Sequence, residues 1–314
     1  MLKSLFVFEH HAMEREFEFI SRRALGYITE GSHLLATTLK IPKEFLDKDI
    51  IRYHTTASDQ TTDQLTASLA IYFLSVFVAV TAVDLLISRP LTFLLAGRGN
   101  TRKYSWFLLH ALFNAMITVV SLEEAYLCAT NPISNAFGPN MWYGTYPAAL
   151  FGAIAIGTFH IHHFVFYPVT REDVIHHCVN AGAVVLAGVY LPWGRCAALS
   201  NVPMCGIPGG INYFVLWLQK STGLISSSAQ KFENRLMNIL VRLPVQLMSF
   251  YIILLGLCTN VIVSVPQVTE GVKWLMLIAA AVHTANAFYY ADQVVGNFHV
   301  FHATKKEGGH AKKE

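Results

Sequence analysis

The stretch that decides the fold is residues 158–195, which read TFHIHHFVFYPVTREDVIHHCVNAGAVVLAGVYLPWGR. One apolar segment ends in three histidines, a short polar connection over residues 170–173 follows, and a second apolar segment begins with a histidine pair. The five histidines that border this connection are His160, His162, His163, His176 and His177. Ionisable groups at membrane depth are costly and mark functional sites by default. These five of the chain's fourteen histidines are therefore the first candidates for a site.

The composition places the chain among membrane proteins. Of its 314 residues, 54% are apolar and only 14% are charged, and the mean hydropathy is +0.42. An ordinary soluble domain has about 45–50% apolar and about 25% charged residues. The net charge of +3, without a basic stripe, argues against nucleic acid as a partner. We therefore expect an all-α, polytopic transmembrane helical bundle that is surrounded by membrane lipids.

Seven apolar segments are candidates for crossing the membrane, since a spanning helix needs about 20 apolar residues. The expected spans are Ala67–Ser88, Tyr104–Leu122, Tyr146–Phe166, Val174–Trp193, Ile207–Gln219, Pro244–Val265 and Trp274–Ala291. The fifth span is short and opens with Pro208-Gly209-Gly210, which leaves open whether it crosses fully or forms a half-helix or a re-entrant segment. The glycines and prolines at 206–210 predict a bend, whose freed backbone groups must be satisfied inside the protein.

Three regions follow from this pattern. Residues 1–66 mix aromatic and charged side chains, and we expect an amphipathic surface arm and a linker, lying on the membrane or on a partner. Residues 67–291 form the transmembrane bundle, and residues 292–314 form a basic C-terminal tail. The arm and the tail are the expected contacts with other subunits of a membrane complex, because an exposed apolar stripe needs a surface to cover it.

The distribution of lysine and arginine favours an odd number of spans. With seven spans, thirteen basic residues lie in the tail and in the connections after spans one, three and five. Only Arg195 and Lys273 lie in the connections on the opposite side. Because short connections rich in Lys and Arg stay on the cytosol-like side, we expect the C-terminus there.

One pair of cysteines is a candidate disulfide. Cys196 and Cys205 flank a stretch with Pro203 on the side opposite the basic tail, which is oxidising in several compartments. Spacing alone does not establish the geometry of a disulfide, so the paired and the free state both stay open.

Polar residues inside the spans are the candidates for a lipid pocket. His110 and Asn114 are four residues apart and share one face of the second span. Asn180 and His283 lie inside later spans. We expect no cofactor, but a bound phospholipid or sphingolipid.

The histidine spacing does not predict a metal site. His160 and His163 are three residues apart, and His299 and His302 repeat that spacing. Membrane di-iron lipid hydroxylases resemble this superficially, but they need several clusters with an HxxxH motif on a helix. A metal needs converging ligands, and the sequence offers no such set, so we predict no metal.

Four motifs in the bundle match a known pattern. They are Arg102, Trp106-x3-His110-x3-Asn114, Asp173-x2-His176-His177 and the run GIPGGINY at 206–213. In these motifs the chain resembles the TLC-domain superfamily, which includes the ceramide synthases, and the resemblance covers about residues 67–291. The later runs QKFENR at 230–235 and VRLP at 241–244 are similar to uncharacterised protist and algal members.

The resemblance implies a role for the histidine pair. His176 or His177 would act as a general base on a lipid amine or hydroxyl, and Asp173 would orient His177. In ceramide synthases the pair is followed by Ala-Thr, a Ser-Tyr series and acids, whereas Cys178-Val179-Asn180 follows here and the acids are missing. The residues allow a second interpretation, in which Thr170 and Asp173 cap a helix and the histidines form interfacial hydrogen bonds.

Two functions fit these observations. The first is a lipid-modifying acyltransferase of the ceramide-synthase type, and the second is a non-catalytic accessory subunit that holds lipid. The departures from the ceramide-synthase pattern, the arm and the lysine-rich tail favour the second. We expect the mitochondrial inner membrane, because the sequence has no cleavable secretory signal, no glycosylation sequon and no KDEL-type signal. The endoplasmic reticulum is the alternative, since Lys312-Lys313 fits an address there.

Seven spans predict that the C-terminus lies on the same side of the membrane as Arg102, because the basic connections share that side. Epitope tags at the C-terminus and next to Arg102 should respond alike to protease in intact organelles. Cleavage of one tag with full protection of the other would contradict the seven-span topology.

Overall fold

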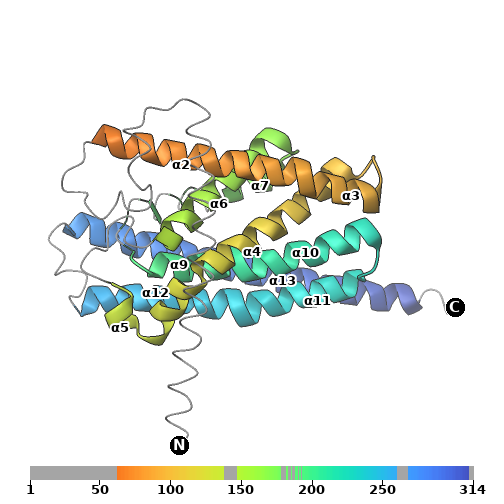
Figure 1. Ribbon diagram of the computed structural model, residues 1–314. Helices are drawn as coiled ribbons and strands as arrows, with labels where there is room; N and C mark the ends of the chain where they lie inside the picture. The colour runs from red at the N-terminus through yellow and green to blue at the C-terminus, as the bar shows by residue number, and fades with distance from the viewer. Residues whose placement is uncertain are drawn as a thin grey trace, which may run out of the picture.

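The computed structural model describes residues 62–137, 147–177, 193–259 and 268–310, with a few single residues between 178 and 192. Every regular element in these ranges is a helix (Figure 1), which confirms the all-α prediction for them. The predictions for residues 1–61, for Asn180 and for most of the span at 174–193 lie outside the described residues.

The helices follow one another in three groups. The first contains α2 (Thr62–Val83), the π-helical turn η4 (Asp84–Ser88), α3 (Arg89–Ala96) and α4 (Thr101–Thr130). The second contains α5 (Pro132–Asn135), α6 (Pro147–Phe166) and α7 (Arg171–His176). The third contains α9 (Cys196–Asn201), η6 (Val202–Gly206), α10 (Ile207–Thr222), α11 (Ser227–Met237), η7 (Asn238–Arg242), α12 (Leu243–Cys258) and α13 (Glu270–His310).

Five helical stretches are long and apolar enough to cross a membrane. They are Leu69–Ala96, Thr101–Thr130, Ala148–Phe166, Ser227–Cys258 and Glu270–Thr304. These stretches overlap the first, second, third, sixth and seventh spans that the sequence predicts. Five such helices indicate an integral membrane protein, because each can bridge the roughly 30 Å of a hydrocarbon core.

The bend predicted at 206–210 is not a helix end. The π-helical turn η6 joins α9 to α10, so that one helical run extends over residues 196–222. Gly206 departs from helical geometry, with a ψ of −99°, but the chain continues as a helix. The segment expected as a short span is therefore the second half of a longer helix.

The carbonyl groups freed by Pro208 are satisfied inside the protein, as the sequence predicts. Pro208 has no N–H to offer the preceding turn. Arg242, at the end of η7, donates to the carbonyl oxygens of Pro203 and Met204 at 3.2 and 3.4 Å. A side chain from another helix thus replaces the missing backbone donor.

Two helices extend beyond their predicted ends. α11 and η7 occupy the expected connection before the sixth span, and α13 continues past residue 291 to form a helix of 41 residues. Such a helix is about 60 Å long, about twice the thickness of the hydrocarbon core. Its C-terminal end projects beyond the other helices (Figure 1).

Cation–π contacts explain why these polar segments are helical. Lys231 Nζ lies 5.3 Å from the ring centre of Phe301, and the Arg235 guanidinium lies 4.8 Å from that of Phe298. The contacts join α11 to the extension of α13, so that basic side chains of α11 cover aromatic rings of α13. The apolar run alone did not reveal this extension.

The helix α4 lies at the centre of the bundle and packs against α3, α6, α9 and α10 (Figure 1). A Cβ built on Gly209 would lie 2.4 Å from Asn114 Nδ2, and one on Gly206 would lie 2.6 Å from Thr118 Oγ1. These glycines allow α10 to approach α4 closely, as small residues do in membrane bundles. The close contact positions the polar residues of α4 against α10.

Candidate functional site

The histidines of the predicted site converge in the structure. His110 on α4 and His177 after α7 lie buried beside the histidine triple of α6. These five of the buried histidines, called the histidine cluster below, are His110, His160, His162, His163 and His177. The side chain of His176 lies outside the described residues. The sequence thus identified four of these five members as candidates around one connection, and placed His110 in a lipid pocket.

A capping box brings α7 back toward α6. The hydroxyl of Thr170 accepts a hydrogen bond from the Asp173 N–H at 3.2 Å, and the Asp173 carboxylate accepts one from the Thr170 N–H at 2.8 Å. This is the capping pair expected from the sequence. Asp173, which the resemblance would assign to orienting a catalytic histidine, therefore fixes the start of α7.

The pair His163 and His177 forms the middle of the histidine cluster. His163 Nδ1 lies 2.9 Å from His177 Nε2, so one nitrogen donates and the other accepts. Trp106 stacks on His163 with ring centres 3.8 Å apart, and the ring of His160 lies 4.3 Å from that of His177. The two histidines are therefore held by each other and by neighbouring rings.

His110 and Asn114 are bonded to each other, as their shared helix face suggests. Asn114 Nδ2 lies 3.1 Å from His110 Nδ1. Tyr213 on α10 stacks on His110, with ring centres 3.8 Å apart and planes at 7°. Tyr213 belongs to the predicted motif at 206–213, but only the close contact of α4 and α10 gives it this role.

A buried ion pair beside the histidine cluster escaped the sequence analysis. Asp84, 1% exposed, accepts hydrogen bonds from Arg89 Nε at 3.0 Å and Nη2 at 2.8 Å, and another from the Tyr167 hydroxyl. His162 Nε2 lies 3.8 Å from the same carboxylate. Burial and the bond to Asp84 raise the pKa of Tyr167, so its phenol stays protonated and donates. The sequence does contain a signal for this ion pair, namely an aspartate inside an apolar span, five residues before an arginine.

His283 belongs to a second polar group. Its Nδ1 lies 3.1 Å from Ser200 Oγ, and Ser200 donates to Gln246 Oε1 at 3.2 Å. The ring of Trp193 lies 5.1 Å from the ring of His283. The lipid-pocket candidates therefore lie in two separate places. His110 and Asn114 lie on the side of α4 that contacts α10, and His283 lies between α9, α12 and α13.

The disulfide considered between Cys196 and Cys205 is not formed, since both thiols are free. The two residues lie nine positions apart on one helical run, which separates them by roughly 13 Å, whereas a disulfide needs Cα atoms within about 7 Å. The sequence interpretation had treated this segment as a loop. Cys196 instead faces α4, where its Sγ lies 3.6 Å from that of Cys128.

The histidines of the cluster contact their neighbours through hydrogen bonds and ring stacking. Within the described ranges, no three His, Cys, Asp or Glu side chains are arranged to hold a metal ion. In the His163–His177 pair, each ring uses one nitrogen on the other. A general base in this pair would therefore act through the ring nitrogen that does not face its partner.

An apolar groove of about 430 Å³ lies between α4 and α10. Its lining consists of Ala111, Leu112, Ala115, Thr118, Val119, Gly206, Ile207, Gly210, Ile211 and Phe214. The groove opens outward, because Leu112 and Phe214 at its rim are 37% and 45% exposed. The sequence analysis missed it, although Gly206 and Gly210 have the GxxxG spacing of closely packed membrane helices.

Comparison with known proteins gives no relative. No family model, no curated protein and no solved structure matches the chain. The resemblance to the TLC-domain superfamily therefore rests on the sequence motifs alone, and function has to be argued from the sites themselves.

We expect His177→Ala to destabilise the protein by about 1–3 kcal/mol, since His163 would be left buried without its partner. His299→Ala, at an exposed position of α13, is the matched control and should have little effect. Thermal unfolding of the purified variants, followed by tryptophan fluorescence, measures the difference.

A different result would contradict the structural role of His177. If the purified protein makes N-acyl lipid from a long-chain base and acyl-CoA, and His177→Ala abolishes this while staying folded, His177 is catalytic and its structural role is wrong.

Proposed function

We propose that the chain is a non-catalytic, TLC-like integral membrane protein that holds a membrane lipid and serves as an accessory subunit of a larger organellar complex. The lipid is a phospholipid or a sphingolipid. The observation that carries this proposal is the apolar groove between α4 and α10.

The groove suits a lipid acyl chain. Ligand sites in proteins typically occupy about 300–1,000 Å³, and this groove falls within that range. Its only side-chain hydroxyl is that of Thr118, and this group already donates to the Asn114 carbonyl at 2.9 Å. A polar ligand would find few hydrogen-bond partners in this groove. A hydrocarbon chain needs no such partners, so its burial there leaves no polar group of the ligand unpaired. Because the groove opens outward on a bundle with five candidate spans, bilayer lipid can reach it from the side.

The state of the histidine cluster supports a non-catalytic role. His163 is bonded to His177, His110 to Asn114, and Nδ1 of His160 lies 2.6 Å from a carbonyl oxygen of its own helix. Of these contacts, the His163–His177 bond joins α6 to the end of α7, and the stacking of Trp106 on His163 adds α4.

One observation favours the alternative, a lipid-modifying acyltransferase. Four members of the histidine cluster converge from three elements at membrane depth, and His110 adjoins the phenol-bearing ring of Tyr213. Clusters of ionisable groups inside a membrane bundle are commonly functional. In this alternative, His177 would be the general base.

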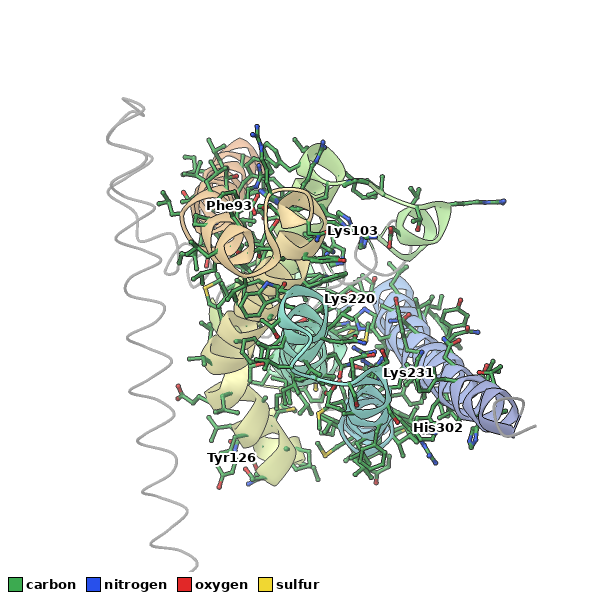
Figure 2. The ribbon with its side chains drawn as sticks, turned by 90° about the vertical axis from the view of Figure 1, so that its right-hand side faces the viewer. Phe93, Lys103, Tyr126, Lys220, Lys231 and His302 are labelled. Atoms are coloured by element: carbon green, nitrogen blue, oxygen red, sulfur yellow. The ribbon has the colours of Figure 1, made fainter. Side chains whose placement is uncertain are left out.

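Seven spans remain our proposal for the topology. The five candidate spans are joined by the helical run at 196–222, which is long enough to cross, and by the apolar sequence at 174–193. Figure 2 looks onto one end of the bundle, where Lys103, Lys220 and Lys231 lie on α4, α10 and α11. Basic residues gathered at one end support the charge asymmetry of this topology.

The helix α13 supports the role of a subunit. It is longer than a membrane is thick, and Trp274, Phe288 and Tyr289 on it are 63%, 51% and 61% exposed. Large aromatic side chains in such numbers are typical of contact surfaces. The mitochondrial inner membrane is the proposed location and the endoplasmic reticulum the alternative, on the sequence features given above.

Filling the groove should expel the lipid. We expect Ala115→Leu, at an exposed position in the groove, to lower the amount of co-purifying lipid several-fold, because the added isobutyl group occupies the space. Ala285→Leu adds the same volume at an exposed position of α13 and serves as the matched control. Lipid extraction and mass spectrometry of both folded variants measure the effect. Equal lipid content in the two would rule out the groove as the lipid site.

An accessory subunit should migrate as part of a large assembly. Native gel electrophoresis of mildly solubilised membranes, probed with an antibody to the C-terminus, should give a band far above the 35.0 kDa chain. A single band near the mass of one chain plus detergent would contradict the role of accessory subunit and favour the acyltransferase.

A further inference from the structure

The guanidinium group of Arg242 replaces a missing backbone donor. In η6 the Ile207 N–H bonds to the Val202 carbonyl, five residues back. The next donor along the helix would be residue 208, but proline has no N–H. Arg242 donates to the two carbonyls that this donor would otherwise reach, those of Pro203 and Met204.

The partners of Arg242 among the described residues are uncharged. Its third hydrogen bond goes to Asn238 Oδ1 at 2.7 Å, and its guanidinium lies 5.1 Å from the ring centre of Tyr290. Among the described residues, the ion pairs are Arg89–Asp84, His162–Asp84 and Lys273–Glu270. Arg242 is only 9% exposed, so this is a buried positive charge without a negative partner in the described part of the chain.

The guanidinium also retains donors. An arginine side chain carries five N–H groups, and the three hydrogen bonds described above use three of them. The Cys205 thiol and the Tyr213 phenol lie within electrostatic range of the charge. Cys205, Tyr213 and Tyr290, which surround Arg242, are half-buried.

A row of cations leads to this position. Lys231, Arg235 and Arg242 lie on one face of α11 and η7, and they contact in turn Phe301, Phe298 and Tyr290 of α13. Lys231 lies at the basic end of the bundle that Figure 2 shows.

We propose that Arg242 binds the phosphate group of an anionic membrane phospholipid. The remaining N–H groups, one on each terminal nitrogen, can donate to phosphate oxygens, and an anion supplies the negative charge that the described residues lack. This inference rests on the proposed function in one respect, namely that the bundle lies in a membrane and holds lipid. It concerns a different site from the groove.

The test needs a variant that removes the charge but keeps the fold. Arg242→Gln alone also removes the donors for the Pro203 and Met204 carbonyls and is expected to unfold. Pro208→Ala restores one backbone N–H, which can bond to one of these two carbonyls and makes the helix less dependent on Arg242. The comparison is therefore between full-length Pro208→Ala and the double variant Pro208→Ala/Arg242→Gln.

The probes are phosphatidylglycerol and phosphatidylcholine with identical acyl chains, added to the purified proteins and measured by native mass spectrometry. We expect Pro208→Ala to prefer phosphatidylglycerol by about tenfold, and the double variant to lose this preference, as for one charge-assisted contact. Millimolar inorganic phosphate should not displace the lipid.

Three outcomes would overturn the proposal. They are equal preference for phosphatidylglycerol in both variants, absence of preference in both, and displacement by inorganic phosphate, which would assign the site to a soluble ion. An absence of preference in both would also fit a carboxylate of the chain, from outside the described ranges, as the occupant. Ala115→Leu separates this test from the proposed function, because filling the groove should lower binding of both lipids alike and leave the preference intact.

Discussion

The bundle depends on the rule that a polar group inside a membrane must find its partner within the protein. The contact between Arg242 and the turn before Pro208 meets this demand. Without it, the carbonyl that the missing Pro208 N–H leaves unpaired would have no donor from a side chain. The contact also fixes the start of α12 against η6 and brings the guanidinium over Tyr290 of α13. The missing backbone N–H of Pro208 in α10 thereby determines how three helices meet.

The same constraint organises the other side of the bundle. Asp84 is acceptable in a membrane span because Arg89 and Tyr167 satisfy its carboxylate. His163 and His177 satisfy each other, and the close approach of α10 places Tyr213 on the ring of His110. Ionisable side chains inside the bundle thus act as connectors between helices. The burial of these side chains is compatible with a folded membrane protein because they have specific partners.

The two proposed lipid contacts differ in chemistry and in place. The groove of α4 and α10 is apolar and open at the side, so it selects for a hydrocarbon chain and not for a head group. The surroundings of Arg242 offer positive charge and hydrogen-bond donors, which select for a head group. A bundle with both features would hold lipids at its surface without performing chemistry on them. This division agrees with a histidine cluster whose members are engaged with one another.

The sequence by itself determined the all-α class, five of the apolar spans, the capping box at Thr170 and Asp173, and the need for an internal donor at 206–210. These features depend on residues only a few positions apart, and hydrophobic runs and caps are local properties. Only the tertiary structure decided that Arg242 is that donor, that Cys196 faces Cys128, and that α11 and α13 extend as a pair. These depend on which helix faces come together. Segments far apart in the chain set that arrangement through close packing, so no local pattern encodes it.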